Sequence, residues 1–329
     1  MKNNISKLFL FLLVFTVLFS CDTDRERVTE TVADIPVNVP AFNEDSAFNY
    51  IQQQVNFGPR VPNTRPHREA GKFLAQSLAD LGWKVTEQEF EATAFDGTVL
   101  QLKNIIASYN PDITKRVLLA SHWDSRPFAD KDTKDQHKPI DGANDGASGV
   151  GVLLEIARAI NENEDPRIGV DIIFFDGEDY GAPEDYEGRQ MEYNGYCLGS
   201  KYWGNNKHEK NYSAYYGILL DMVGAPNARF YREGHSMDIA PSIVKKVWDR
   251  AHSLGHGQYF IYKDGSPITD DHLFVYERGK IPMIDIIDYD PENIFADYHH
   301  THDDNISLIE KSTLKAVGET VLHVIYHEN

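Results

Sequence analysis

The segment Val170-Asp-Ile-Ile-Phe-Phe-Asp-Gly-Glu-Asp179 decides the fold class of this 329-residue chain. Val170 and Ile172 to Phe175 are apolar, which is typical of a strand buried on both faces of a parallel or mixed sheet. Glu178 and Asp179 follow at its carboxyl end, where open α/β sheets bind their ligands. An isolated Glu-Asp pair is more often a solvated turn, so its interpretation depends on the rest of the chain.

The composition narrows the classes of protein and partner. Hydrophobic residues make up 41% of the chain, enough for one large core, and we expect one catalytic domain. The 51 acidic and 32 basic residues leave a net charge of −19, which repels phosphate backbones, so no nucleic acid partner is expected. Two cysteines, Cys21 and Cys197, are too few for a disulfide framework.

The first 20 residues are typical of a secretory signal. Lys2 and Lys7 precede an apolar run from Leu8 to Phe19, which is too short for a membrane span. Cys21 follows in a context that resembles the bacterial lipobox, where the cysteine is acylated; cleavage by an ordinary signal peptidase is the alternative. We therefore expect a protein of the bacterial cell envelope, facing the periplasm, that touches the membrane only through a lipid on Cys21.

The rest of the chain divides into a tether, residues 21–41, and a single catalytic domain, residues 42–329. Within the domain, apolar runs and helical patterns alternate, which predicts an α/β fold. Strands are expected at 83–91, 99–108, 116–121, 170–175, 215–220, 258–262 and 282–287. Helices are expected at 44–56, 66–81, 150–161, 197–206, 240–254 and 308–327, with a short one ending at Gly279.

Polar side chains recur at the ends of these apolar strands, and this shared placement favours a common site. They are His122, Asp124, Asp145, Glu178, Asp179, Asp221, Asp270 and His300. Imidazole and carboxylate groups suit zinc, and three protein ligands with an open position are typical of a catalytic zinc site. Each residue alone would more often be a surface group or a satisfied core group.

Several other residues are interpreted as having no role in binding or catalysis. Asp130, Asp132 and Asp135 lack the glycine and the terminal glutamate of a calcium loop, so solvated charge is expected there. Cys197 has no adjacent histidine or lysine and is interpreted as an inert buried thiol. Trp203 is interpreted as a core residue.

Seven segments together resemble the M28 zinc peptidases and, within them, the glutaminyl cyclases, over most of residues 43–329. They are His122-Trp-Asp-Ser125, Gly142-Ala-Asn-Asp145, Phe174-Phe-Asp-Gly-Glu-Asp179, Leu198-Gly-Ser-Lys-Tyr-Trp203, Leu219-Leu-Asp-Met-Val-Gly-Ala-Pro226, Asp270-Asp-His272 and His300-Thr-His-Asp-Asp304. The resemblance implies a three-layer zinc-exopeptidase-like fold, with a central mixed, mostly parallel sheet flanked by helices. It also implies that N-terminal glutamine of peptides or proteins is converted to pyroglutamate with release of ammonia.

The resemblance further implies that Asp145, Asp179 and His300 hold one zinc ion per chain. Glu178 would be the general acid and base, with Asp221 and Asp270 as catalytic residues hydrogen-bonded around it. A cis peptide bond between Asp145 and Gly146 is also implied.

Some family positions differ here. Asp179 stands where glutamate is often found. Of two pocket tryptophans of the animal cyclases one is missing, and the other is replaced by His299. His302 is a rival metal ligand, but the family pattern His-Thr-x-x-Asp fits a start at His300.

Two other functions remain open. A dizinc aminopeptidase would use His122 and Asp221 for a second metal, with Asp145 bridging, and a metal-bound hydroxide would cleave the peptide bond. All five ligand positions exist in this chain. A catalytically inactive binding lipoprotein is disfavoured, because every chemical position is retained.

Overall fold

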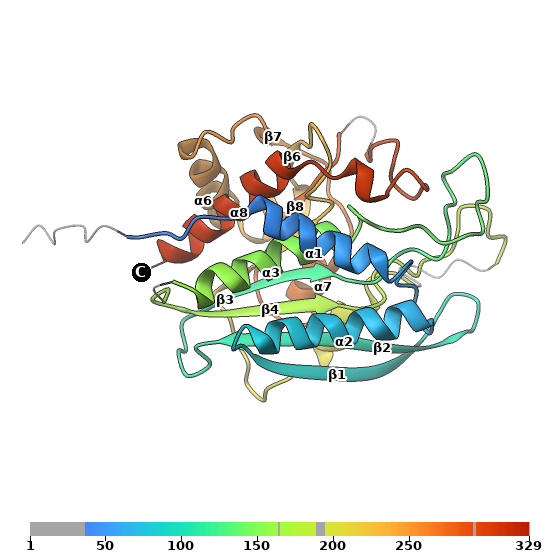
Figure 1. Cartoon of the computed structure of the whole chain (residues 1–329), viewed down its shortest axis with the longest axis horizontal. Helices are drawn as coiled ribbons and strands as arrows, with labels where there is room; N and C mark the ends of the chain where they lie inside the picture. The colour runs from blue at the N-terminus through green and yellow to red at the C-terminus, as the bar shows by residue number, and fades with distance from the viewer. Residues whose placement is uncertain (1–36, 164, 189–194, 292–293, 329) are drawn as a thin grey trace, which may run out of the picture. The chain divides into compact units, whose positions relative to one another are not determined.

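The strand predicted at 170–175 lies inside a six-stranded sheet (Figure 1). A computed structural model describes residues 37–163, 165–188, 195–291 and 294–328, so the expected signal, Cys21 and most of the tether lie outside the described residues. The strand order is β1-β2-β4-β3-β5-β8. The strands are β1 (Lys84–Thr93), β2 (Val99–Tyr109), β3 (Arg116–His122), β4 (Gly169–Phe175), β5 (Tyr216–Asp221) and β8 (Met283–Ile287).

Three of the five strand pairs are parallel. β4 pairs with β3, β3 with β5, and β5 with β8 in parallel, whereas β2 runs antiparallel to both β4 and β1. This arrangement confirms the predicted mixed, mostly parallel sheet. Because β3, β4, β5 and β8 run in the same direction, their carboxyl ends meet at one edge of the sheet.

The sheet is covered by helices on both faces, because alternate residues of its buried strands point to opposite sides. Ile172 and Phe174 of β4 join one hydrophobic core, and Ile173 and Phe175 join another. The first core is covered by α1 (Glu44–Asn56), α2 (Arg65–Asp80), α3 (Ala147–Asn161), α6 (Pro241–Ser253) and α8 (Lys311–Tyr326). The second core is covered by α4 (Leu198–Asn205) and α7 (Asp271–Glu277), which confirms the predicted three layers; Trp203 is fully buried there, as expected.

Short elements were missed by the sequence pattern. β6 (Phe230–Arg232) pairs in parallel with β7 (Phe260–Asp264) in a separate two-stranded sheet, and α5 (Gly234–Ile239) follows β6. β6 and α5 are too short for a hydrophobic period to be visible. A 3₁₀ turn at Ile306–Leu308 precedes α8.

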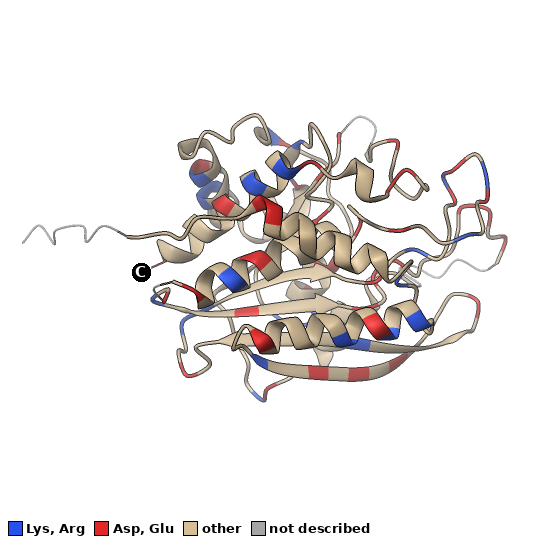
Figure 2. Cartoon of the chain, in the orientation of Figure 1, with Lys and Arg blue, Asp and Glu red and all other residues tan. Residues whose placement is uncertain are grey.

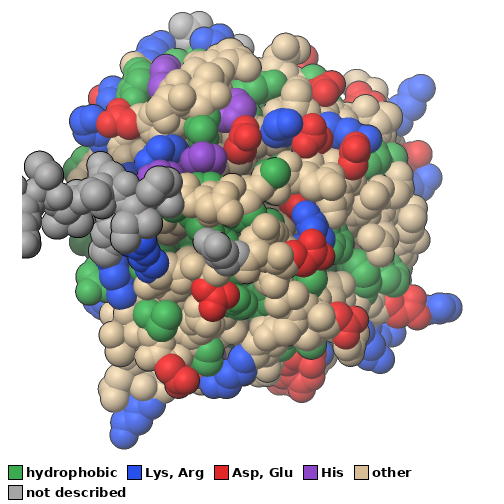
Figure 3. Space-filling model, turned by 60° about the vertical axis from the view of Figure 1, so that its left-hand side comes forward, with side chains coloured by type: hydrophobic (Ala, Val, Ile, Leu, Met, Phe, Trp, Pro, Cys, Tyr) green, Lys and Arg blue, Asp and Glu red, His purple; other side chains and the backbone are tan. Residues whose placement is uncertain are grey.

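The charges of the described residues are spread over the surface (Figure 2). β1 is an edge strand, and its exposed positions include Glu87, Glu89 and Glu91. Acidic positions appear red along this strand in Figure 2. Charge on an edge strand opposes pairing with another chain. On the face drawn in Figure 3, acidic and basic side chains are interspersed. Among the described residues, no helix is both long and apolar enough to span a bilayer.

Candidate active site

The predicted site residues gather at the edge where the parallel strands end. A cavity of about 400 Å³ is lined there by Asp145, Glu178, Asp179, Asp221, Asp270 and His300. His122 and Asp221 are the last residues of β3 and β5, and Glu178 and Asp179 follow β4. His122 and Asp124 are buried beneath the lining residues. Sequence positions up to 178 apart are thus brought to one place.

Asp145, Asp179 and His300 face one another in the cavity. His300 Nε2 lies 3.4 Å from Asp179 Oδ1 and 3.8 Å from Asp145 Oδ2. Asp179 Oδ2 is buried and has no hydrogen-bond partner among the described residues. Burial, and then the guanidinium of Arg126, lower the pKa of His300 to about 3, which favours the neutral imidazole that a metal requires. The three side chains therefore fit a zinc ion.

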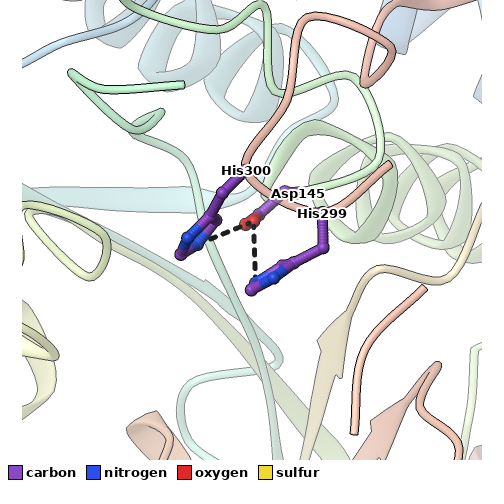
Figure 4. Close-up of side chains that lie close together, drawn as sticks. All are labelled: Asp145, His299 and His300. Atoms are coloured by element: carbon purple, nitrogen blue, oxygen red, sulfur yellow. Dashed lines mark ion pairs between the residues drawn. The ribbon is translucent and has the colours of Figure 1, made fainter. Parts of the chain in front are cut away.

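His299 lies close to the same carboxylate, as Figure 4 shows. Its Nε2 is 3.9 Å from Asp145 Oδ2, so Asp145, His299 and His300 also form a group that could hold a metal. The Nδ1 atom of His299, however, lies 2.7 Å from Lys131 Nζ. When an ammonium donates to Nδ1, the neutral ring carries its hydrogen on Nε2 and offers no lone pair to a metal.

His302, the rival ligand in the sequence, points elsewhere. Its backbone N–H and its Nδ1 lie 3.0 and 2.9 Å from Asp132 Oδ2, and its side chain is 38% exposed. The expectation of solvated charge was wrong for Asp130, which is buried and binds Arg126 through both carboxylate oxygens, whereas the Asp132 side chain stays 21% exposed while it contacts His302. Asp132 contacts His302 and Asp130 also lies near His300, and no local pattern reveals these partners, which are distant in sequence.

A second group of possible ligands adjoins the first. His122 Nε2 lies 3.0 Å from Asp145 Oδ1 and 3.4 Å from Asp221 Oδ1. Although burial opposes protonation, the carboxylates of Asp124, Asp145 and Asp221 close to the ring hold the pKa of His122 well above its usual value. Burial chiefly raises the pKa of Asp221 to about 7. These are the residues that a second metal would need.

The backbone N–H of Glu178 is hydrogen-bonded, and its side chain contacts a thiol. Asp124 accepts hydrogen bonds from the backbone N–H groups of Glu178 (3.1 Å) and Asp179 (3.2 Å), which fixes the turn that carries both acids. Cys197 is buried as predicted, but its Sγ lies 3.1 Å from Glu178 Oε1, so it contacts the site. Burial, and then the charges of Asp270 and Asp179, raise the pKa of Glu178 well above its usual value.

Asp270 is the N-cap residue of helix α7 and adjoins a buried polar network. Its Oδ1 accepts the backbone N–H of Asp271, while atoms of Asp270, Glu178 and Cys197 lie within 4.8 Å of one another. Behind it, His272 lies 3.2 Å from Glu233 and 3.8 Å from Asp285, all three fully buried. Neither Asp285 nor Glu233 was predicted as a site residue from the sequence. A charged residue inside the apolar run of β8 was the available signal for Asp285.

Asp145 is positioned by the chain's C-terminal half. Asp304 accepts hydrogen bonds from the backbone N–H groups of Asn144 (2.7 Å) and Asp145 (3.0 Å). The predicted cis peptide between Asp145 and Gly146 was wrong, because the described residues contain no cis bond. Gly146 instead turns the chain with a φ of +86°, and a Cβ there would lie 2.8 Å from the His122 ring.

Comparisons with known proteins agree with this fold and site. The family model described as "Peptidase family M28" matches residues 104–325. A solved Bacteroides thetaiotaomicron glutaminyl cyclase is 54% identical, with a TM-score of 0.86 over 89% of this chain and 100% of that one. A structure described as a leucine aminopeptidase precursor from the same organism is 53% identical, with a TM-score of 0.86 over 89% and 100%. The glutaminyl-peptide cyclotransferase of Drosophila melanogaster is 28% identical over 78% of this chain and 73% of its own length.

The fold and the site define an α/β enzyme of the zinc-exopeptidase class. Within that class, the chain belongs to peptidase family M28.

Proposed function

We propose that this protein is a glutaminyl-peptide cyclotransferase, which converts N-terminal glutamine of peptides or proteins to pyroglutamate and releases ammonia. The observation that carries the proposal is a glutamate of raised pKa, Glu178, in one cavity with three side chains that fit a zinc ion. The similarity to bacterial glutaminyl cyclases at about half of all positions supports the same reaction.

The reaction needs no external nucleophile. The α-amine of an N-terminal glutamine can reach its own γ-carbonyl carbon, so the enzyme gains rate mainly by holding the two groups together. A carbon–nitrogen bond forms between them, and the bond to the side-chain nitrogen breaks to release ammonia. A metal-generated hydroxide, and therefore a second metal, is not required.

One zinc ion per chain would be held by Asp145, Asp179 and His300, and it would supply Lewis-acid polarisation of the γ-carbonyl. Glu178 would take a proton from the attacking amine and return it to the departing nitrogen, so one carboxyl acts as base and then as acid. Asp270 lies beside Glu178 and is also buried, so the two carboxyl groups cannot both be fully ionised at the same time. Asp221 would belong to the same proton network through His122.

A dizinc aminopeptidase is the second candidate, because His122, Asp145 and Asp221 lie close enough to hold another metal. The two functions are separated by assaying the purified protein on matched N-terminal Gln and Leu substrates with ammonia detection. We expect ammonia and pyroglutamate from Gln. Release of free Leu without ammonia, together with two tightly bound zinc ions per chain, would establish the aminopeptidase instead.

We also propose that the protein is lipid-anchored through Cys21 in a bacterial cell envelope and faces the periplasm. The support is the basic start, the apolar run and the lipobox-like context of the cysteine. Cys21→Ser should therefore move the protein from the membrane fraction to the soluble fraction. Unchanged membrane association of that variant would contradict lipidation.

A further inference from the structure

The loop that follows β3 contacts the segment that carries His300 through two acidic side chains. Asp130 Oδ1 lies 3.6 Å from Nδ1 of His300, the ring nitrogen that faces away from the proposed metal ligands. Two residues further on, Asp132 accepts a hydrogen bond from the backbone of His302 (3.0 Å) and lies 2.9 Å from its Nδ1. The two acids thus hold both ends of the segment 300–302.

Lys131, between these acids, contacts His300 and two residues that precede it, His299 and Phe295. Its backbone N–H donates to the carbonyl of His300 (3.3 Å), and its Nζ lies 2.7 Å from Nδ1 of His299. Its ammonium also lies 5.5 Å from the centroid of the Phe295 ring. The residue as a whole is exposed, but its charged end is directed at the wall of the cavity.

The histidine rings form part of a stack. The ring of His299 lies between that of Phe295, with centroids 4.2 Å apart, and that of His300, with centroids 3.7 Å apart; both pairs are within 27° of parallel. Stacking alone does not distinguish the two ring orientations related by a half-turn, because the flat faces are alike. The hydrogen bond from Lys131 to Nδ1 does distinguish them, and it directs Nε2 toward Asp145.

We propose that Lys131 is a positioning residue for the metal-binding side chain His300, acting through His299. The ammonium holds the His299 ring in one orientation, and that ring braces the face of His300 so that its Nε2 stays directed at Asp145 and Asp179. The fixed orientation also places the ring hydrogen of His299 on Nε2, which keeps His299 from competing for the metal. The proposal rests on the ligand set given under Proposed function.

The sign of the effect on zinc affinity separates this role from simple charge repulsion. Lys131 is a cation near a site for a divalent cation, so removal of its charge alone would tighten zinc binding. Loss of a positioning contact would weaken it, and outer-shell partners of metal ligands typically contribute about 10- to 100-fold in affinity. Because Lys131 is exposed, we expect an effect at the lower end, about tenfold.

The test measures the zinc dissociation constant of the full chain, purified in detergent, by competition with a chromophoric chelator and without substrate. Lys131→Met keeps the aliphatic stem and should weaken zinc binding about tenfold. Lys131→Arg keeps a cationic donor and should restore most of the affinity. Lys134→Met, an exposed lysine of the same loop, is the matched control and should leave it unchanged. Circular dichroism of the metal-free variants checks that they fold.

Equal or tighter zinc binding by Lys131→Met would overturn the positioning role. His300→Ala separates this failure from a failure of the ligand set. If His300→Ala weakens zinc binding and Lys131→Met does not, only the positioning role is wrong. If His300→Ala binds zinc as tightly as the unmodified chain, the ligand set is wrong and the positioning role fails with it.

Discussion

Replacement of Asp124 by Asn should destabilise the turn that carries Glu178 and Asp179. The Asp124 carboxylate is fully buried and accepts the backbone N–H groups of both acids, at 3.1 and 3.2 Å. Burial alone would raise its pKa, but the neighbouring His122 ring, with Nδ1 3.5 Å from Asp124 Oδ1, and these two N–H groups hold the pKa of Asp124 below its usual value. The carboxylate is therefore ionised when it holds the turn.

The size of the effect follows from these two bonds. A hydrogen bond to a charged group contributes about 1.5–3 kcal/mol, and a buried N–H left without a partner costs about 1–3 kcal/mol. Asn keeps one oxygen acceptor and presents an NH₂ group to the other N–H, so we expect a loss of about 2–4 kcal/mol in the free energy of unfolding. A shift of about 1 Å in a catalytic group can cost roughly 100-fold in rate, so turnover should fall on that scale.

Urea unfolding followed by tryptophan fluorescence measures the first effect, and pyroglutamate formation at saturating zinc measures the second. Asp96→Asn is the matched control, because Asp96 also accepts a backbone N–H, from Thr98 at 2.9 Å, but on the exposed surface. It should change the free energy of unfolding by less than about 0.5 kcal/mol. If the free energy of unfolding of Asp124→Asn is within about 1 kcal/mol of that of the unmodified protein, and its turnover is within about threefold, Asp124 does not stabilise the turn as proposed.

Three further predictions concern the proposed catalytic groups. Glu178→Gln should retain zinc but lose about 100-fold or more in turnover, as measured by metal analysis and ammonia release, because a general acid and base is removed; turnover within tenfold would argue against that role. His300→Ala should lose the metal itself, and a full zinc complement in that variant would exclude His300 as a ligand. In metal-free protein, Asp221→Asn should unfold like the unmodified chain at about pH 3, below the ordinary Asp pKa of 3.8, because Asp221 is then neutral in the folded and the unfolded state; it should be the more stable of the two at pH 8. The reason is that the pKa of Asp221 is raised to about 7, so its stabilising contribution is present below its unfolded pKa and is lost as the pH rises through the folded one; the difference is at most about 4 kcal/mol, and equal stabilities across this range in urea titrations would contradict it.

Much of the fold could be predicted because its central elements are long and strongly patterned. The apolar runs of β3 and β4 are buried on both faces, so their hydrophobicity alone indicates interior strands. The acids that follow them are placed by chain connectivity, since a residue next to a strand end must lie at the edge of the sheet. The family motifs then imply which of those acids bind metal, and the structure brings the three proposed ligands together.

Tertiary structure alone decided the contacts that join distant loops. From the sequence, Asp130 and Asp132 are predicted to be solvated charges, because no nearby residue shows that the segment near residue 300 folds back onto them. The same holds for the Cys197 thiol at Glu178 and for Lys131 at His299. The physical reason is that periodicity and propensity report on the backbone within a few residues, whereas the partner of a buried polar group is fixed by where separate segments meet in space. The sequence by itself therefore determined the layers of the fold, the edge of the sheet where the site lies and the reactive side chains at that edge. Only the folded chain decided which other side chains orient those reactive groups.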